Sequence, residues 1–119
     1  MYYWLLEEGE SHLGIKINNI ILAGDSAGGN LCTALTLLCI KKCYKIPLAC
    51  ILSYPASFVG PDRFVPSLLY SLEDVLLPTK FLKSALNSYS GKIKETNPLC
   101  EANTFDLISP MIASLNLLK

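Results

Sequence analysis

The sequence lacks both an excess of charge of either sign and a long apolar run. Its 119 residues carry ten basic and ten acidic side chains, so the charge balance favours neither a nucleic acid nor an anionic membrane as a partner. The longest dense apolar stretch runs from Leu31 to Ile40 and is followed by two lysines. A spanning helix needs ~20 apolar residues, so we expect no transmembrane segment.

Histidine is almost missing, since His12 is the only one in the chain. It precedes the apolar run of residues 20–23, which we predict to be a strand. A strand of ~5 residues rises ~3.3 Å per residue, so His12 would lie about 16 Å or more from the far end of this strand. We therefore expect His12 to be a helix-end or surface residue, and not the base for a nucleophile at that far end.

Cysteine occurs five times, but without the paired spacing of metal or redox sites. The five are widely spaced, and no C-x-x-C pair is present. Cys39 and Cys43 have the spacing of two residues on one face of a helix. We expect reduced thiols, no metal site and a cytoplasmic protein.

What the sequence does have is a glycine-rich turn, Gly24-Asp25-Ser26-Ala27-Gly28-Gly29, between two apolar segments. The turn fits the pattern G-x-S-x-G, in which a strand turns abruptly into a helix and small neighbours accommodate a strained serine. Such a turn holds the serine hydroxyl clear of the sheet and directs the first free NH groups of the helix toward the same place. The turn therefore predicts that Ser26 is a nucleophile beside part of an oxyanion hole.

Two phosphate-binding patterns and one purely structural role are the alternatives for this turn. A P-loop requires a lysine after its last glycine, and a dinucleotide site requires G-x-G-x-x-G. The turn has neither feature. In the structural alternative, Ser26 only caps the helix. The strand before the turn and the helix after it favour the nucleophile, and no cofactor is indicated.

The segments around the turn predict an α/β fold. Residues 20–23 form a continuous apolar run, typical of a parallel strand that is buried on both faces. Residues 30–43 are apolar nearly all round, as in an interior helix, and residues 48–54 form a second apolar strand. Together they predict a βαβ unit with parallel strands. Flanking helices are predicted over residues 2–13 and from Thr79 to Gly91.

The turn and several other segments form a set that occurs together in one enzyme family. The set comprises Gly24-Asp25-Ser26-Ala27-Gly28-Gly29-Asn30-Leu31, Tyr54-Pro55-Ala56, Ser71-Leu72-Glu73-Asp74-Val75-Leu76-Leu77-Pro78, Ser88-Tyr89-Ser90-Gly91 and Ile108-Ser109-Pro110-Met111. These segments resemble the hormone-sensitive lipase branch of the α/β-hydrolases, and the last three look like its animal members. The resemblance spans nearly the whole chain.

The resemblance implies a serine carboxylic ester hydrolase that acts on acylglycerols or similar lipid esters. By position, Ser26 would be the acylated nucleophile and the backbone NH of Ala27 an oxyanion donor. Leu72, Leu76 and Leu77 would lie near the acyl chain of the substrate, although the same leucines also suit core packing. Neither a metal nor a cofactor is implied. The resemblance allows a cytoplasmic protein that associates peripherally with lipid droplets.

The chain departs from this family in the rest of the catalytic machinery. Members carry an HGG-type oxyanion loop before the serine and an Asp and a His after it, and the matching motifs are missing from residues 1–119. Sheets average about five or six strands, whereas two strands are predicted here. We therefore interpret residues 1–119 as the central portion of an α/β-hydrolase domain with an incomplete sheet, and we expect these residues alone to be inactive.

Two further functions stay open at this point. The missing catalytic Asp and His also fit a non-catalytic ligand-binding or interaction protein built on the hydrolase fold. An esterase or deacetylase acting on short acyl groups would carry the same turn. The flanking coding sequence would discriminate between an enzyme and a binding protein, because an enzyme needs the HGG loop and the later Asp and His.

Overall fold

The computed structural model describes residues 1–59, 75–96 and 105–113. Short helices come first, a strand-helix-strand unit follows, and further helices complete the described chain. In order, the elements are α1 (Tyr2–Glu7), α2 (Gly9–Leu13), β1 (Ile21–Asp25), α3 (Ser26–Lys41), β2 (Ala49–Ser53), α5 (Thr79–Thr96), α6 (Phe105–Ile108) and the 3-10 helix η3 (Pro110–Ile112).

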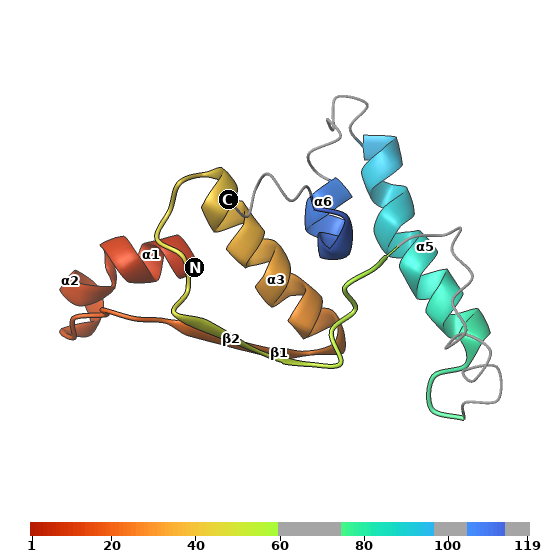
Figure 1. The fold of residues 1–119 in the computed structure, drawn as a ribbon, viewed down its shortest axis with the longest axis horizontal. Coiled ribbons are helices and arrows are strands. Elements are labelled where there is room, and N and C mark those ends of the chain that lie inside the picture. Colours follow the sequence, from red (N-terminus) through yellow and green to blue (C-terminus); the bar gives the residue numbers. More distant parts are fainter. Residues whose placement is uncertain (60–74, 97–104, 114–119) are drawn as a thin grey trace.

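The predicted βαβ unit is confirmed. Strands β1 and β2 are parallel and in register, with Ile21 opposite Ala49 at one end and Asp25 opposite Ser53 at the other. Helix α3 follows β1 directly and runs back along the sheet, as Figure 1 shows. The serine turn therefore lies at the carboxyl end of β1, at the same edge as the end of β2.

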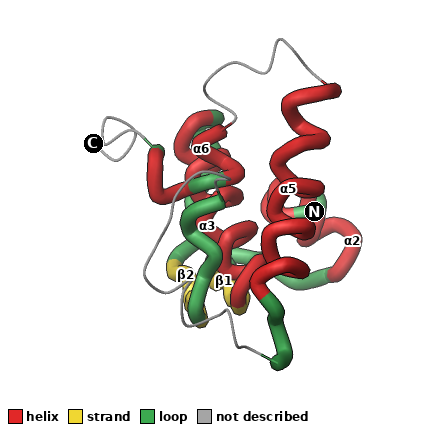
Figure 2. The backbone as a smooth tube through the Cα atoms, turned by 90° about the vertical axis from the view of Figure 1, so that its right-hand side faces the viewer, coloured by secondary structure: helices red, strands yellow, loops and turns green. Residues whose placement is uncertain are grey.

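The burial predicted for both faces of the strand over residues 20–23 is wrong, and the second strand is not buried either. Every residue of β2 is exposed, and β1 alternates between exposed and half-buried residues. Helices α3 and α6 lie on one side of the two strands in both views of the described chain (Figures 1 and 2). The described residues place no helix on the other side, so apolar side chains such as Ile51, 64% exposed, face solvent there.

The predicted N-terminal helix is divided into α1 and α2 at Glu8. Gly14, with φ +67°, ends α2 in the left-handed conformation that glycine adopts at helix ends. His12 lies in the last turn of α2, is exposed, and contacts the ring of Trp4 at a centroid distance of 5.4 Å. The prediction of a helix-end histidine is therefore confirmed. Figure 1 places α2 at the opposite end of β1 from the start of α3.

Helix α5 begins at Thr79, as predicted, but continues through Gly91 to Thr96. The predicted end at Gly91 is thus wrong, because a glycine inside a helix costs only about 1 kcal/mol relative to alanine. Within residues 1–59, 75–96 and 105–113, no helix has the length and apolar character needed to cross a membrane.

Candidate active site

The turn after β1 holds Ser26 in a strained backbone conformation. Ser26 is the first residue of α3 and has φ +48°, in the left-handed region that residues other than glycine rarely adopt. A Cβ on Gly24 would lie 2.5 Å from the carbonyl carbon and oxygen of Gly28, and a Cβ on Gly29 would lie 2.8 Å from the Cβ of Pro55. Only glycine fits these two positions, so the small residues of the motif are required by close backbone approach.

The end of β2 is tied to the turn through a hydrogen bond. The hydroxyl of Tyr54 donates to Oδ2 of Asp25 at 2.9 Å. This hydrogen bond to a carboxylate, together with the negative charge, raises the pKa of Tyr54 above its ordinary value, because both favour the protonated phenol. Tyr54 also has a positive φ, +36°. The residues that follow β1 and β2, Ser26 and Tyr54, thus both have a positive φ, and the hydrogen bond from Tyr54 to Asp25 links the two strand ends.

The backbone around Ser26 continues this connection. The NH of Ala56 donates to the carbonyl of Ser26 at 3.0 Å, and the buried side chain of Asn30 donates to the carbonyl of Ala56 at 2.6 Å. The NH of Ala27 belongs to the first turn of α3, where backbone NH groups have no acceptor within the helix. The helix dipole adds a positive potential at this end. An oxyanion near Ser26 would be stabilised by these features.

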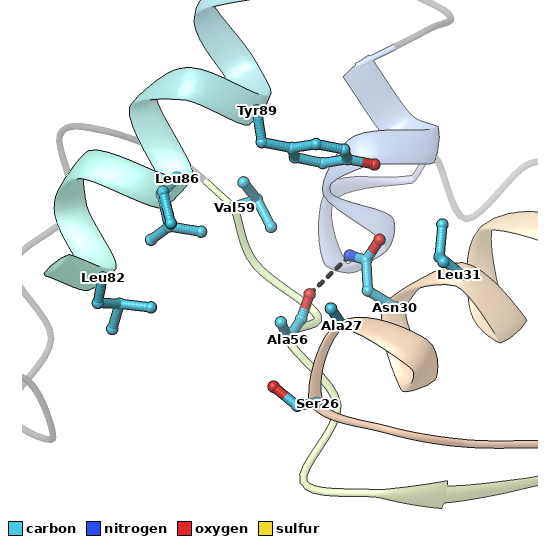
Figure 3. A pocket seen from close by; sticks show the side chains of 10 residues that line it. Ser26, Ala27, Asn30, Leu31, Ala56, Val59, Leu82, Leu86 and Tyr89 are labelled. Atoms are coloured by element: carbon cyan, nitrogen blue, oxygen red, sulfur yellow. Dashed lines mark hydrogen bonds between the residues drawn. The ribbon is translucent and has the colours of Figure 1, made fainter. Parts of the chain in front are cut away.

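The hydroxyl of Ser26 opens onto an apolar cavity of about 320 Å³, a size typical of small-molecule sites. Its walls come from the start of α3, from the segment after β2 and from α5. The lining residues are Ser26, Ala27, Asn30, Leu31, Ala56, Val59, Leu82, Ala85, Leu86 and Tyr89 (Figure 3).

The structure brings Ser26 and Ala27 together at this cavity, but not the predicted leucines. Leu76 and Leu77 are 93% and 42% exposed, and neither lines the cavity. Leu72 lies outside the described residues. Side chains of α5 form the far wall instead, as Figure 3 shows for Leu82 and Leu86. Their spacing on a predicted helix was the signal in the sequence that could have identified them.

The side chains around the cavity include the hydroxyl of Ser26 but no histidine. Asp25 is the neighbouring acid, and its carboxylate accepts from Tyr54. His12, at the other end of β1, does not approach the cavity. In the part of the chain that the structure describes, no group of three His, Cys, Asp or Glu side chains could hold a metal ion. The arrangement can therefore present the hydroxyl of a serine at a strained turn to an apolar ligand, without a base beside it among the described residues.

The chain matches one protein family and several curated proteins of known name. A family model described as alpha/beta hydrolase fold matches residues 1–115. Hormone-sensitive lipase of Homo sapiens is 38% identical over 90 residues, which cover 76% of this chain and 8% of the lipase. Hormone-sensitive lipase of Bos taurus is 38% identical over 86 residues, 72% of this chain and 11% of the lipase. The chain thus spans about a tenth of the length of these curated relatives.

Two solved structures are also similar. Carboxyl esterase 2 from the mycorrhizal fungus Tuber melanosporum matches with a TM-score of 0.76 and 30% identity, covering 98% of this chain and 35% of that one. The apo form of ESTFA matches with a TM-score of 0.60 and 26% identity, covering 95% of this chain and 33% of that one. The chain therefore corresponds to about a third of the length of each of these two proteins.

Proposed function

The chain belongs to the alpha/beta hydrolase fold family, and on this premise we propose that the protein is a serine carboxylic ester hydrolase, a lipase or esterase. Ser26 is the nucleophile and the backbone NH of Ala27 is an oxyanion donor. The observation that carries the proposal is the strained position of Ser26 at the strand-helix turn, where its hydroxyl meets an apolar cavity. The similarity to hormone-sensitive lipase and to carboxyl esterase 2 supports it.

The proposed reaction passes through an acyl-enzyme. The Oγ of Ser26 attacks the ester carbonyl while a base takes its proton, and the resulting oxyanion accepts a hydrogen bond from the NH of Ala27. Collapse of this intermediate releases the alcohol and leaves the acyl group on Ser26. Water, activated by the same base, then releases the carboxylic acid and restores the serine.

The base must come from outside residues 1–119, because His12 is the only histidine and lies at the wrong end of β1. We propose that these residues form the central portion of a hydrolase domain, with the remaining oxyanion donor and the catalytic Asp and His contributed by other parts of a longer protein. The coverage of about a third of each of the two similar solved chains supports this arrangement.

The proposed substrates are acylglycerols or similar lipid esters, with the acyl chain in the apolar cavity. The walls of the cavity are aliphatic apart from Ser26, Asn30 and Tyr89, so an acyl chain is solvated better there than in water. The proposal includes a cytoplasmic protein that associates peripherally with lipid droplets. The exposed apolar side chains of Val75, Leu76 and Phe81 support such an association.

A fluorophosphonate probe tests the proposed nucleophile. The longer protein is incubated with the probe, digested, and analysed by peptide mass spectrometry. We expect one adduct, on the peptide that contains Ser26, because only an activated serine reacts readily with such a probe. An adduct on a different serine would assign the nucleophile elsewhere.

Residues 1–119 alone are expected to show negligible ester turnover. Loss of a single oxyanion donor costs about 10²- to 10³-fold in rate, and loss of the base leaves the serine hydroxyl unactivated. The measurement is hydrolysis of a p-nitrophenyl ester by the purified 119-residue chain, with a Ser26→Ala version as its control. Turnover by the first above that of the second would contradict the expectation.

If the acyl chain binds in the cavity, a smaller cavity should favour esters with shorter acyl chains. Leu86→Trp fills part of the cavity on the wall that α5 forms, so we expect turnover of an octanoyl ester to fall about 10-fold or more relative to an acetyl ester. Phe81→Trp is the matched control, because Phe81 lies on the same helix, is 64% exposed and does not line the cavity. The ratio of kcat/KM values for the two esters is the measurement. Equal ratios in both variants would show that the acyl chain does not bind in this cavity.

The alternative function is non-catalytic binding of an apolar ligand. One observation favours it: the sequence offers no histidine to Ser26. In that case the longer protein would bind a fluorescent fatty acid but would form no fluorophosphonate adduct. The proposed hydrolase gives the adduct, so the probe experiment distinguishes the two functions. An esterase for short acyl groups would differ only in the ester preference measured above.

A further inference from the structure

The side chain of Asn30 joins three parts of the molecule. Asn30 lies in the first turns of α3, is 4% exposed, and donates from one nitrogen, Nδ2, to two backbone carbonyls. One acceptor is Ala56 at 2.6 Å, drawn as a dashed line in Figure 3, and the other is Ile108 of α6 at 2.9 Å. The segment after β2 and helix α6 are thus both fixed to the helix that begins with Ser26.

The bond to Ala56 reaches the backbone of the nucleophile. Ala56 accepts from Asn30 through its carbonyl and donates through its NH to the carbonyl of Ser26 at 3.0 Å. Asn30 and Ser26 are about one helical turn apart. Both are linked by a hydrogen bond to the same residue, Ala56. The position of Ser26 therefore depends on two successive hydrogen bonds that begin at the Asn30 amide.

The chain just after α6, at Ser109 and in η3, is attached to the same segment by two more hydrogen bonds. The NH of Val59 donates to the fully buried Oγ of Ser109, and the NH of Met111 donates to the carbonyl of Ser57, each at 3.0 Å. These bonds come from residues about fifty positions apart in sequence, and they hold α6 and η3 against residues 55–59. Asn30, which lines the cavity, joins the same two parts through its hydrogen bonds to Ala56 and Ile108.

The chemistry of the site selects an amide at this position. Both partners of Nδ2 are carbonyl oxygens, so the group between them must donate twice, which the amide nitrogen can do. A serine hydroxyl donates once, and an aliphatic side chain not at all. A buried carbonyl that loses its donor becomes unfavourable and drives local rearrangement.

We propose that Asn30 is a positioning residue of the hydrolase: it holds residues 55–59 and α6 in the places that fix the backbone of Ser26. The inference rests on the proposed function of Ser26. Asn30 is expected to act on the chemical step, because a displacement of the nucleophile by about 1 Å can cost about 10²-fold in rate. The binding of an ester is expected to change less than the chemical step, because the aliphatic walls on α5 stay in place while Asn30, Ala56 and Val59 also line the cavity.

The test compares variants that differ in the number of donors. In the longer protein, Asn30→Ser keeps one donor and Asn30→Leu keeps none at similar size. Thr36→Val is the matched control, because the Thr36 hydroxyl bonds to the Cys32 carbonyl within α3, meets Sγ of Cys50 on β2 at 3.4 Å, and does not line the cavity. For each variant, kcat and KM for one ester are measured per folded molecule, with the folded fraction taken from circular dichroism.

We expect kcat per folded molecule to fall in the order of lost donors, by about 10-fold or less in Asn30→Ser and by about 10²-fold in Asn30→Leu. KM changes by a smaller factor than kcat, and Thr36→Val leaves both constants unchanged. If Asn30→Leu does not fold, Asn30→Ser alone decides the outcome. A merely structural role would lower the folded fraction and leave kcat per folded molecule at the parent value, which would overturn the inference.

Probe labelling of Ser26 tests the proposed function separately from the role of Asn30. A parent protein that forms no fluorophosphonate adduct on Ser26 would overturn the proposed function and this inference with it. A parent protein that is labelled on Ser26, with unchanged kcat in the folded Asn30 variants, would overturn only the role of Asn30.

Discussion

Replacement of Ser26 with alanine is expected to abolish covalent labelling and to lower ester turnover by about 10⁶-fold in the longer protein, the size of effect seen when a catalytic serine is removed. The Oγ of Ser26 is the atom that forms the acyl-enzyme in the proposed reaction, and no other described group at the cavity can replace it. The measurement is kcat/KM for a p-nitrophenyl ester together with probe labelling.

The matched control for this experiment is Ser53→Ala. Ser53 lies opposite Asp25 at the end of the neighbouring strand, is exposed, and does not line the cavity. We expect its replacement to leave labelling and turnover at the parent level. Turnover that persists in Ser26→Ala, with an intact fold, would assign the nucleophile to another residue.

Substitution of Gly24 by alanine is expected to destabilise the fold by about 3 kcal/mol or more. The added Cβ would lie 2.5 Å from the backbone carbonyl carbon and oxygen of Gly28. Overpacking costs about 1–3 kcal/mol where side chains can move, and backbone atoms of the first turn of α3 cannot move without displacing Ser26. The measurement is the free energy of unfolding from urea titration.

Gly28→Ala provides a control within the same motif. A Cβ on Gly28 would meet only Oδ1 of Asp25 at 3.8 Å, which is an ordinary contact. Gly28 lies inside α3, where alanine is favoured over glycine by about 1 kcal/mol. We expect Gly28→Ala to be as stable as the parent or slightly more stable. Equal destabilisation by the two substitutions would contradict the close approach at Gly24.

The local parts of the site could be predicted from the sequence because their causes are local. The spacing of Gly24, Ser26 and Gly28 determines a strand-helix turn, and the turn places Ser26 in its strained conformation. The two apolar runs and the helix between them predict the parallel pair, since a connection of this length returns the chain in the same direction.

The remaining parts depend on tertiary packing that no local pattern encodes. Asn30 and Ile108 are 78 positions apart, and nothing near either residue identifies the other as its partner. Leu82, Leu86 and Tyr89 have helical spacing in the sequence, but the face that they present to Ser26 depends on where α5 packs. Leu76, in contrast, belongs to a leucine-rich run that suggested a pocket wall, and it is exposed.

The exposed parallel strands have a consequence for handling these residues in solution. Each strand pairs with one neighbour in the described chain, so its outer edge presents backbone NH and carbonyl groups beside apolar side chains such as Ile21 and Ile51. Edges of this kind template the addition of strands from other molecules. Residues 1–119 in isolation therefore have an intrinsic tendency to aggregate that grows with protein concentration, and dilute samples are the conditions in which the βαβ unit keeps its own pairing.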